Sequence, residues 1–440
     1  MKVVVIGVGH VGLVTAATMA HCGHEVVGLD DDLAKLEQVK QGTMPFIEPG
    51  LPELVASVTG PQSPSGGKLT FESDYSNALP GAQVAFICVG TPARPDGEAN
   101  LAAVEKAAGT AAKHSTGDLV IVQKSTVPVM TADRLKKLFA RQGWGRLHLA
   151  SNPEFLREGS AVADSLDPDR ILVGSDDEFA QQTMRELYRP LIEQGAPYLA
   201  TDIKTAELAK HACNAFLALK ISYANALARI CEKSGADVAT IADIMGLDRR
   251  IGRDFLNPGP GYGGYCLPKD VAAFKVTAAK FGYDFGLLEE VMKINAEAID
   301  ASFERIKDSL WNLEGKRVLL LGLSFKAGTD DTRESPSLKL AEKLIGAGVE
   351  VVGCDPHANN QAAQAVPGLS VKQDPYAAAE GADCIVICTR AKEFAGLDLS
   401  RLKGIVTNAV IVDTCNLLDP KVMADSGFTY LPNGRPPVNL

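Results

Sequence analysis

Residues 1–30 read MKVVVIGVGHVGLVTAATMAHCGHEVVGLD, and this stretch decides the fold class. The segment at 2–6 becomes continuously apolar after its first residue, which is typical of a buried parallel strand. GVGHVG follows at once at 7–12, residues 13–21 favour a helix, and EVVGLD at 25–30 is a second apolar strand. This order of strand, glycine turn, helix and strand predicts a βαβ unit.

The three glycines of GVGHVG have the GxGxxG spacing of a dinucleotide-binding turn. In such a turn Gly7 gives the tight bend, Gly9 lets the backbone approach a pyrophosphate, and Gly12 lets helix and strand pack closely. A glycine turn without a ligand is the alternative, but Asp30 ends the second strand, where an acid binds the adenosine ribose hydroxyls. Because that carboxylate would repel a 2′-phosphate, the stretch predicts NAD as the cofactor rather than NADP.

Three further apolar runs predict strands of the same sheet: AQVAFICVG at 82–90, DLVIVQKST at 118–126 and RLHLASNPE at 146–154. Each run ends in small or polar residues. Ligands bind at the carboxyl ends of strands in an open parallel sheet, so the residues there are candidates to face one crevice. Each alone would be an ordinary turn residue. These candidates are Thr91, Ser125, Thr126, Asn152 and Glu154.

A long helix is predicted from about Ile203, because neither proline nor glycine occurs from there until Gly235. About 30 residues at 1.5 Å each would span about 45 Å, which suits a link between two domains. Its apolar residues lie on more than one face, which favours a contact between subunits.

Lys210 and Asn214 lie four residues apart in this helix and therefore on one face. An ammonium beside a carboxamide can stabilise an oxyanion in a dry cleft. By spacing alone, a solvated Lys210 paired with Glu207 is the alternative.

The C-terminal part repeats the order of the N-terminus. KRVLLLGLSFK at 316–326, a helical stretch at 335–348 and EVVGCD at 350–355 match strand, helix and strand, and EVVGCD echoes EVVGLD. The offset is 325 between Glu25 and Glu350 (350 − 25) but 315 between Gly7 and Gly322 (322 − 7), so the second copy has ten more residues in its first loop. That loop lacks GxGxxG and contains Lys326 and Arg333, so we expect a second nucleotide-type domain with a different ligand.

Together these patterns predict an α/β protein with two Rossmann-like doubly wound domains, joined by a central helical domain with one long helix. The expected domain limits are 1–200, 201–300 and 314–440. Strands at 382–389 and 410–416 are expected to complete the C-terminal sheet, and residues after about 419 carry no motif.

Composition narrows the class of protein. Lys and Arg total 44 against 54 Asp and Glu, without a basic run, which argues against nucleic acid as a partner. The nine cysteines are scattered without CxxC pairs or histidines at zinc spacing, which favours a reduced protein without a metal site. No signal peptide and no run of about 18 apolar residues is found, so we expect a cytoplasmic protein without a membrane span.

Cys266 stands apart from the other cysteines because it follows the glycine-rich loop in GPGYGGYCLPKD at 259–270. The PKD sequence after it predicts a helix that begins near the cysteine, and a helix N-terminus lowers the pKa of a thiol. A thiol packed beside a turn is the alternative. With NAD, a nucleophilic cysteine permits oxidation of an alcohol to an acid through an aldehyde, a thiohemiacetal and a thioester.

Four motifs together resemble one known family. NPEFLREGSA at 152–161 with DPDRILVG downstream, ELAKHACNAF at 207–216, the cysteine loop and FKAGTDDTRESPS at 325–337 are similar to the UDP-glucose/GDP-mannose dehydrogenases, in the family's order from Met1 to about Asn416. The cysteine loop is most similar to that of members acting on UDP-glucose. The resemblance implies NAD-dependent four-electron oxidation of UDP-glucose to UDP-glucuronate, with GDP-mannose or another nucleotide sugar as the alternative. Outside this class, a non-catalytic NAD-binding regulatory protein is the competing hypothesis.

The resemblance also implies residue roles. Cys266 is the expected nucleophile, Lys210 and Asn214 stabilise oxyanions, and Asp270 organises water and proton transfers. Glu154 and Thr126 are the expected general base and water-positioning residue. The implied cofactor residues are Gly7, Gly9, His10, Val11, Gly12, Asp30, Lys35, Thr91, Ser125, Thr126, Glu158 and Arg333. The implied substrate residues are Glu154, Phe155, Leu156, Arg157, Lys210, Asn214, Arg253, Tyr262, Gly263, Gly264 and Lys326.

The family resemblance implies no metal and a homodimer, or a larger assembly, formed through the central helix. We interpret Arg170 as a structural residue, a partner for Asp167 or Asp169; a place on the substrate side is the alternative. Lys269 has no predicted role.

Overall fold

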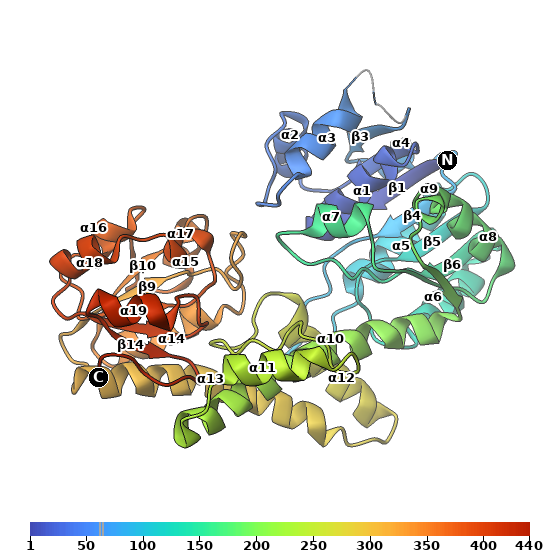
Figure 1. The fold of residues 1–440 in the computed structure, drawn as a ribbon. Coiled ribbons are helices and arrows are strands. Elements are labelled where there is room, and N and C mark those ends of the chain that lie inside the picture. The colour runs from blue at the N-terminus through green and yellow to red at the C-terminus, as the bar shows by residue number, and fades with distance from the viewer. Residues whose placement is uncertain (61–62, 64–65) are drawn as a thin grey trace. The chain divides into compact units, whose positions relative to one another are not determined.

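The computed structural model describes residues 1–60, 63 and 66–440 and divides the chain into two compact units. One unit comprises Met1–Cys213 with Ala272–Phe281, and the other comprises Asn214–Val271 with Gly282–Leu440. Each unit is built on one sheet with helices (Figure 1). Two helices, α10 (Ile203–Ser234) and α12 (Cys266–Lys280), contribute residues to both units.

The first unit has an eight-stranded sheet in the order β3-β2-β1-β4-β5-β6-β7-β8. All neighbouring strands are parallel except β6 and β7, which are antiparallel. The strand order reverses between β1 and β4, where open sheets of this kind bind their ligand. The strands are β1 (Lys2–Ile6), β2 (Glu25–Leu29), β3 (Lys68–Glu72), β4 (Val84–Ile87), β5 (Leu119–Gln123), β6 (Leu147–Ser151), β7 (Ile171–Gly174) and β8 (Tyr198–Thr201).

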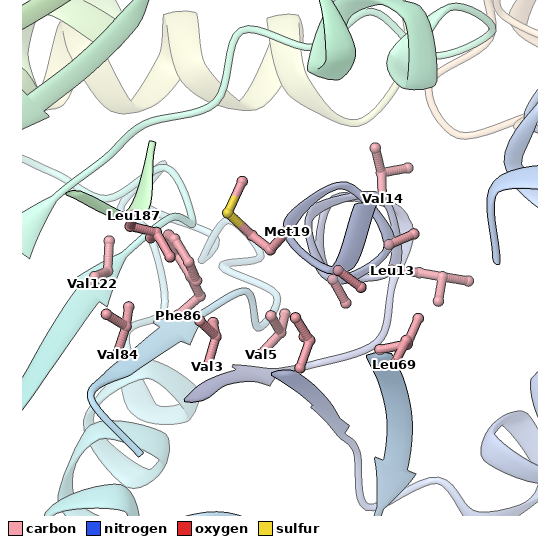
Figure 2. Packing of buried hydrophobic residues seen from close by; sticks show 14 of the residues in the cluster. Val3, Val5, Leu13, Val14, Met19, Leu69, Val84, Phe86, Val122 and Leu187 are labelled. Atoms are coloured by element: carbon pink, nitrogen blue, oxygen red, sulfur yellow. The ribbon is translucent and has the colours of Figure 1, made fainter. Parts of the chain in front are cut away.

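The central strands of this sheet are apolar without alternation because both of their faces are buried. Val3 and Val5 of β1 pack in one core with Phe86 of β4 and Met19 of α1, as Figure 2 shows. The alternate residues of the same strands, such as Val4, belong to a second core on the other face. The helices of this unit are α1 (His10–His21), α2 (Leu33–Lys40), α3 (Leu51–Thr59), α4 (Tyr75–Ala78), α5 (Ala102–His114), α6 (Thr131–Gln142), α7 (Ala161–Leu166), α8 (Glu178–Leu187) and α9 (Arg189–Glu193).

The second unit contains a parallel six-stranded sheet in the order β11-β10-β9-β12-β13-β14. This order repeats that of the first six strands of the other sheet, which confirms two Rossmann-like domains. The 32-residue α10 confirms the long central helix. The strands are β9 (Arg317–Leu321), β10 (Glu350–Cys354), β11 (Ser370–Val371), β12 (Cys384–Ile387), β13 (Val410–Asp413) and β14 (Thr429–Pro432).

The sequence analysis was wrong to complete this sheet at β13. The chain continues through α19 into β14, which pairs with β13 in parallel. The strand is short and ends in proline, so its pattern is weak. Tyr430 is nevertheless fully buried, and its hydroxyl donates to Asp413 at 2.9 Å. The helices of this unit, besides α10 and α12, are α11 (Val238–Leu247), α13 (Gly286–Leu310), α14 (Pro336–Gly346), α15 (Asn359–Ala365), α16 (Pro375–Ala379), α17 (Lys392–Ala395), α18 (Leu399–Ile405) and α19 (Pro420–Ser426).

Candidate active site

The glycine turn between β1 and α1 has the geometry of a pyrophosphate cradle. Gly7 has a left-handed φ of +95°, and a Cβ on Gly12 would lie 1.7 Å from the carbonyl oxygen of Gly7. By contrast, a Cβ on Gly9 would meet no atom within 4 Å. Gly9 is the residue before the first turn of α1, so the open space lies at the helix N-terminus, where N–H groups attract an anion. The turn therefore fits a dinucleotide.

Asp30 follows β2 and is held against this turn. One of its carboxylate oxygens accepts the backbone N–H of Val8 at 2.7 Å. Lys35, an expected cofactor residue, lies with its Nζ 3.0 and 3.1 Å from the two carboxylate oxygens of Asp30. The acid is thus placed beside the glycine turn with a cation of its own chain beside it.

Glu48 is a buried carboxylate that the sequence analysis missed. One of its oxygens lies 2.8 Å from Nε2 of His10, whose ring stacks on Phe46 at 4.4 Å. The carboxylate also accepts the backbone N–H groups of Gly159 and Ala161, each at 2.8 Å. Glu48 therefore connects the glycine turn, through His10, with the segment that follows Glu154. No spacing or motif in the sequence marks it.

Hydroxyl groups tie together the loops after β4 and β5. The Oγ of Ser125 donates to the carbonyl oxygens of Ile87 and Val89 at 3.1 and 2.7 Å. The Oγ1 of Thr91 donates to the carbonyl oxygen of Thr126 at 3.0 Å. The structure thus brings Thr91, Ser125 and Thr126 to the same edge of the sheet.

Glu154 and Lys210 form a buried ion pair. The Nζ of Lys210 lies 3.1 Å from Oε1 of Glu154, and both side chains are about as buried as core residues. The other oxygen of Glu154 accepts the backbone N–H of Leu156 at 2.7 Å. Because a buried ion pair costs desolvation energy, this pair is a candidate for a functional role.

Glu207 is not the partner of Lys210, so the solvated alternative was wrong. Glu207 is itself buried, and its oxygens accept the backbone N–H groups of Met130 and Ala132 at 2.8 and 3.0 Å. It therefore caps the N-terminus of α6. Burial raises the pKa of Glu207 to about 7, although these two hydrogen bonds oppose the shift.

Phe155 is covered by two cations. The guanidinium of Arg170 lies 3.8 Å from the ring centroid, and Nζ of Lys210 lies 5.2 Å from it. A guanidinium nitrogen of Arg170 also lies 3.8 Å from Sγ of Cys213. Arg170 therefore packs on the aromatic ring in a cation–π contact.

Two other expected site residues of this segment are near the surface. Arg157 is exposed and pairs with Asp164 at 2.5 Å. Glu158 is half-buried beside it. Val11 lies in the first turn of α1, where its carbonyl oxygen accepts the hydroxyl of Thr15.

Cys266 is the first residue of α12, as the PKD sequence predicted. Asp270 lies one turn further and is fully buried. Its carboxylate accepts the amide of Asn214 and the ammonium of Lys269, each at 2.6 Å. Lys269, which had no predicted role, thus compensates the buried charge of Asp270 while that charge orients the Asn214 amide.

The glycine loop before Cys266 is fixed by α13. The amide of Asn295 on that helix bonds to both backbone groups of Tyr262, accepting from its N–H at 2.7 Å and donating to its carbonyl oxygen at 3.0 Å. Tyr262 is buried, and burial raises its pKa to about 12.

Two glycines of this loop pack against the loop of the C-terminal domain that replaces GxGxxG. A Cβ on Gly263 would lie 2.3 Å from the carbonyl oxygen of Glu334, and Gly264 donates its N–H to the carbonyl oxygen of Arg333 at 3.0 Å. Gly264 also has a φ of +77°. These glycines are therefore required by close backbone packing within the chain, a reason that the sequence alone did not reveal.

Arg333 and Tyr265 bring this contact close to Cys266. The guanidinium of Arg333 lies 4.5 Å from the ring centroid of Tyr265, the residue before the cysteine, and pairs with Asp331 at 2.5 Å. Lys326 lies in the same C-terminal loop, where its carbonyl oxygen accepts the hydroxyl of Ser324 at 2.9 Å.

Arg253 occupies a different place. It lies after α11, pairs with Asp243 at 2.6 Å and packs so closely on Gly246 that a Cβ there would lie 2.7 Å from its side chain. Its guanidinium also donates to Oδ1 of Asn257 at 2.8 Å.

The three comparisons with known proteins agree. The chain matches the NAD binding domain of the UDP-glucose/GDP-mannose dehydrogenases over residues 1–192, the central domain over 204–297 and the UDP binding domain over 319–420. The chain belongs to this dehydrogenase family. The predicted cofactor, NAD, is thereby confirmed for the domain that contains the glycine turn.

Relatives of known name match over nearly the whole chain. A UDP-glucose 6-dehydrogenase of Rhizobium meliloti is 41% identical, with 99% of this chain and 100% of the relative covered. The solved structure of a UDP-glucose dehydrogenase from Pyrobaculum islandicum is 33% identical, with a TM-score of 0.89 and coverages of 99% and 98%. A UDP-D-ManNAc dehydrogenase from Pyrococcus horikoshii is 27% identical, with a TM-score of 0.86 and 99% of both chains covered.

Some features are not found in the part of the dehydrogenase that the structure describes. Across residues 1–60, 63 and 66–440, no helix is both long and apolar enough to span a membrane. The same residues contain no group of three or more His, Cys, Asp or Glu arranged to hold a metal ion. All nine cysteines are described, and none is in a disulfide.

Proposed function

We propose that this dehydrogenase oxidises UDP-glucose to UDP-glucuronate and reduces two NAD for each sugar. The observation that carries the proposal is Cys266 at the N-terminus of α12, directly after the glycine loop and one turn before the buried Asp270. A two-electron alcohol dehydrogenase needs no such thiol, whereas oxidation to the acid passes through a covalent thioester. NAD supplies the hydride acceptor in both oxidation steps.

The proposed oxidation proceeds through an aldehyde, a thiohemiacetal and a thioester. The substrate alcohol loses a proton to the site and a hydride to NAD to give the aldehyde. The thiolate of Cys266 adds to the aldehyde carbon, and the resulting oxyanion takes up a proton to give a thiohemiacetal. Loss of a second hydride and the hydroxyl proton leaves a thioester. Water then adds to the carbonyl carbon, the carbon–sulfur bond breaks, and the thiol and the carboxylate are released.

Two buried pairs, Lys210 with Glu154 and Asn214 with Asp270, suit the charges that develop during this reaction. We assign Lys210 and Asn214, one helical turn apart on α10, to the oxyanions of the addition steps. Glu154 is positioned to exchange protons with Lys210, and Asp270 holds the Asn214 amide. Thr126 is assigned to the hydrolytic water, with Glu154 as its general base.

The sugar nucleotide is assigned from similarity. The match of residues 319–420 to a UDP binding domain supports a uridine diphosphate, and relatives named as UDP-glucose dehydrogenases support glucose. The UDP-D-ManNAc dehydrogenase has nearly the same TM-score, so the fold alone does not separate the sugars. Another nucleotide sugar, including GDP-mannose, is therefore the second candidate. A purely regulatory NAD-binding protein is disfavoured because it would gain nothing from two buried ion pairs.

We further propose a homodimer formed through α10. Phe216, Tyr223 and Ile230 follow one another at seven-residue spacing on that helix, and they are 60%, 52% and 63% exposed. Such a stripe is typical of a helix face that a second helix covers. Tyr223→Glu should convert the dimer to a monomer in light scattering, and an unchanged mass would contradict this interface. Thiols without disulfides support the cytoplasm as the compartment.

The reaction is tested by product analysis of two cysteine variants. Cys266→Ser should still bind UDP-glucose but form no UDP-glucuronate, because a serine hydroxyl lacks a thiol's nucleophilicity. Cys388→Ser, which alters a buried cysteine directly after β12, is the matched control and should keep acid formation. Full acid formation by Cys266→Ala would refute the covalent mechanism. Absorbance of NADH with UDP-glucose, GDP-mannose and UDP-N-acetylmannosamine in turn decides the substrate.

A further inference from the structure

Glu48 has no role in the proposed mechanism, although its carboxylate contacts two parts of the candidate site. It lies in the segment between α2 and α3, and its side chain is fully buried. Three hydrogen bonds of 2.8 Å reach it, from Nε2 of His10 and from the backbone N–H groups of Gly159 and Ala161. Of the basic side chains in the described ranges 1–60, 63 and 66–440, only His10 lies within ion-pair distance. A buried carboxylate is costly unless such groups surround it, so its position is closely specified.

His10 connects Glu48 with the NAD turn. It is the first residue of α1 and follows Gly9, where a Cβ would meet no atom within 4 Å. The first N–H groups of a helix have no partner within the helix and attract an anion, such as the pyrophosphate of NAD. The imidazole of His10 is fixed on two sides, by a stacked contact with Phe46 at 4.4 Å and by Glu48. Glu48 thus orients the residue that begins the anion-binding end of α1.

Gly159 and Ala161 connect Glu48 with the segment that carries Glu154. Residues 152–158 run from the end of β6 to Gly159. One end of this segment is fixed by the pairing of β6 with β5, and the other by the two backbone N–H groups that donate to Glu48. The proposed general base therefore lies on a short segment whose far end depends on Glu48.

We propose that Glu48 is a positioning residue that holds the NAD turn and the segment of the general base in a fixed relation. It acts on the cofactor through His10 and on Glu154 through the two backbone groups. Without the carboxylate, the first residue of α1 is less firmly held, so NAD should bind more weakly, and residues 152–158 can shift, so kcat should fall. The part that concerns kcat rests on the proposed function, whereas the part that concerns NAD rests on the family's NAD binding domain.

Glu48→Gln is the first test, because it keeps the size of the side chain but replaces one acceptor oxygen with an NH2 group. That group faces an N–H donor instead of accepting from it. We expect the dissociation constant of NAD to rise about tenfold in calorimetry, and kcat at saturating NAD and UDP-glucose to fall about tenfold. Glu53→Gln, the same change at an exposed position of α3, is the matched control and should equal the wild type in both measurements.

Variants of His10 test whether Glu48 acts on NAD through this residue. His10→Gln keeps an N–H donor for the carboxylate, whereas His10→Phe keeps a ring to stack on Phe46 but has no donor. His10→Gln should therefore bind NAD about tenfold more tightly than His10→Phe. Combining Glu48→Gln with His10→Phe should weaken NAD binding no further than Glu48→Gln alone, because both changes remove the same contact.

Multiplied losses of NAD affinity in the double variant, or equal affinities of His10→Gln and His10→Phe, would overturn the inference. A purely structural Glu48 would lower thermal stability and leave the NAD affinity and kcat of the folded enzyme unchanged, which would also overturn it. If Glu48→Gln does not fold, the two single variants of His10 decide. The wild-type enzyme is first assayed for UDP-glucuronate. No product there contradicts the proposed function, whereas product with unchanged NAD affinity in Glu48→Gln contradicts only the role of Glu48.

Discussion

The two nucleotide-type sheets share a strand order and nearly the same second strand, yet they use its terminal acid differently. Asp30, after EVVGL, is half-buried and holds one backbone group of the glycine turn, Val8, and the Lys35 ammonium. Asp355, after EVVGC, is 2% exposed and accepts hydrogen bonds from its own loops. The donors to Asp355 are the N–H groups of Leu323, Ser324, His357 and Ala358 and the hydroxyl of Ser324.

The turns before α1 and α14, the first helix of each repeat, also differ between the two domains. Gly9 leaves open space before α1, whereas α14 begins at Pro336 after a buried Ser335, whose hydroxyl donates to Leu323 at 2.8 Å. The longer second loop also packs on the cysteine loop at Gly263 and Gly264. A repeated fold therefore does not repeat its ligand, because the loop of the second copy satisfies the groups that the first copy leaves available.

The largest expected effect comes from adding a side chain at Gly12, where α1 packs on the glycine turn. Gly12→Ala places a methyl group 1.7 Å from the Gly7 carbonyl oxygen, so helix and turn must separate. We expect NAD affinity to fall by about 100-fold or more, measured by calorimetry. Gly346→Ala at the end of α14, where a Cβ meets nothing within 4 Å, is the control and should bind NAD normally. Normal NAD binding by Gly12→Ala would break the comparison.

Replacing Asp355 should mainly lower stability, whereas replacing Asp30 should mainly weaken NAD binding. Asp355→Ala leaves its buried donors without an acceptor and should lower the free energy of unfolding by about 4 kcal/mol. Asp30→Ala should instead weaken NAD binding about tenfold or more with a smaller effect on stability, since it loses the ribose ligand. Chemical denaturation and NAD titration of both variants measure this. Equal losses of stability in the two variants would contradict the distinction.

A buried carboxylate makes the stability of the first unit depend on pH. The pKa of Glu207 is about 7 in the fold against an ordinary 4.5, so the folded state binds the proton more tightly than the unfolded state. Its contribution to stability is therefore full below pH 4.5 and is lost as pH rises toward 7, by about 3 kcal/mol. Glutamine does not titrate, so the unfolding free energy of the wild type should fall by that amount relative to Glu207→Gln as pH rises across this window. A constant difference between them would show that Glu207 does not titrate there.

The smallest expected effect tests whether the C-terminal loop that contains Glu334 positions the cysteine loop. Gly263→Ala brings a methyl group 2.3 Å from the Glu334 carbonyl oxygen and displaces the segment that carries Cys266. We expect kcat to fall about tenfold, because small displacements of a nucleophile are costly. Gly259→Ala, with nothing within 4 Å of its Cβ, should remain close to wild type. If both variants were equally active, the packing of this loop would not position the cysteine.

The sequence was sufficient for the main architecture because Gly7, Gly9, Gly12 and Asp30 carry a local pattern and the C-terminal half repeats it. It also predicted a helix that begins near Cys266, where α12 starts. β14 was missed because four residues ending in proline give almost no periodicity.

Several contacts of the site had no sequence signal at all. Glu48 and Asn295 are isolated polar residues whose importance depends on partners far along the chain. Lys269 had no predicted role, since only the fold reveals that it neutralises the buried Asp270. Patterns in sequence report local periodicity, whereas burial of a charge is decided by tertiary packing.

The central claim, a four-electron oxidation on an NAD domain whose structural repeat binds a different ligand, is tested most directly by stoichiometry. A limiting amount of UDP-glucose is added to the enzyme with excess NAD, and NADH is measured by absorbance while the sugar product is identified by mass. The account predicts two NADH and one UDP-glucuronate for each UDP-glucose consumed. One NADH with an aldehyde as the final product would contradict it.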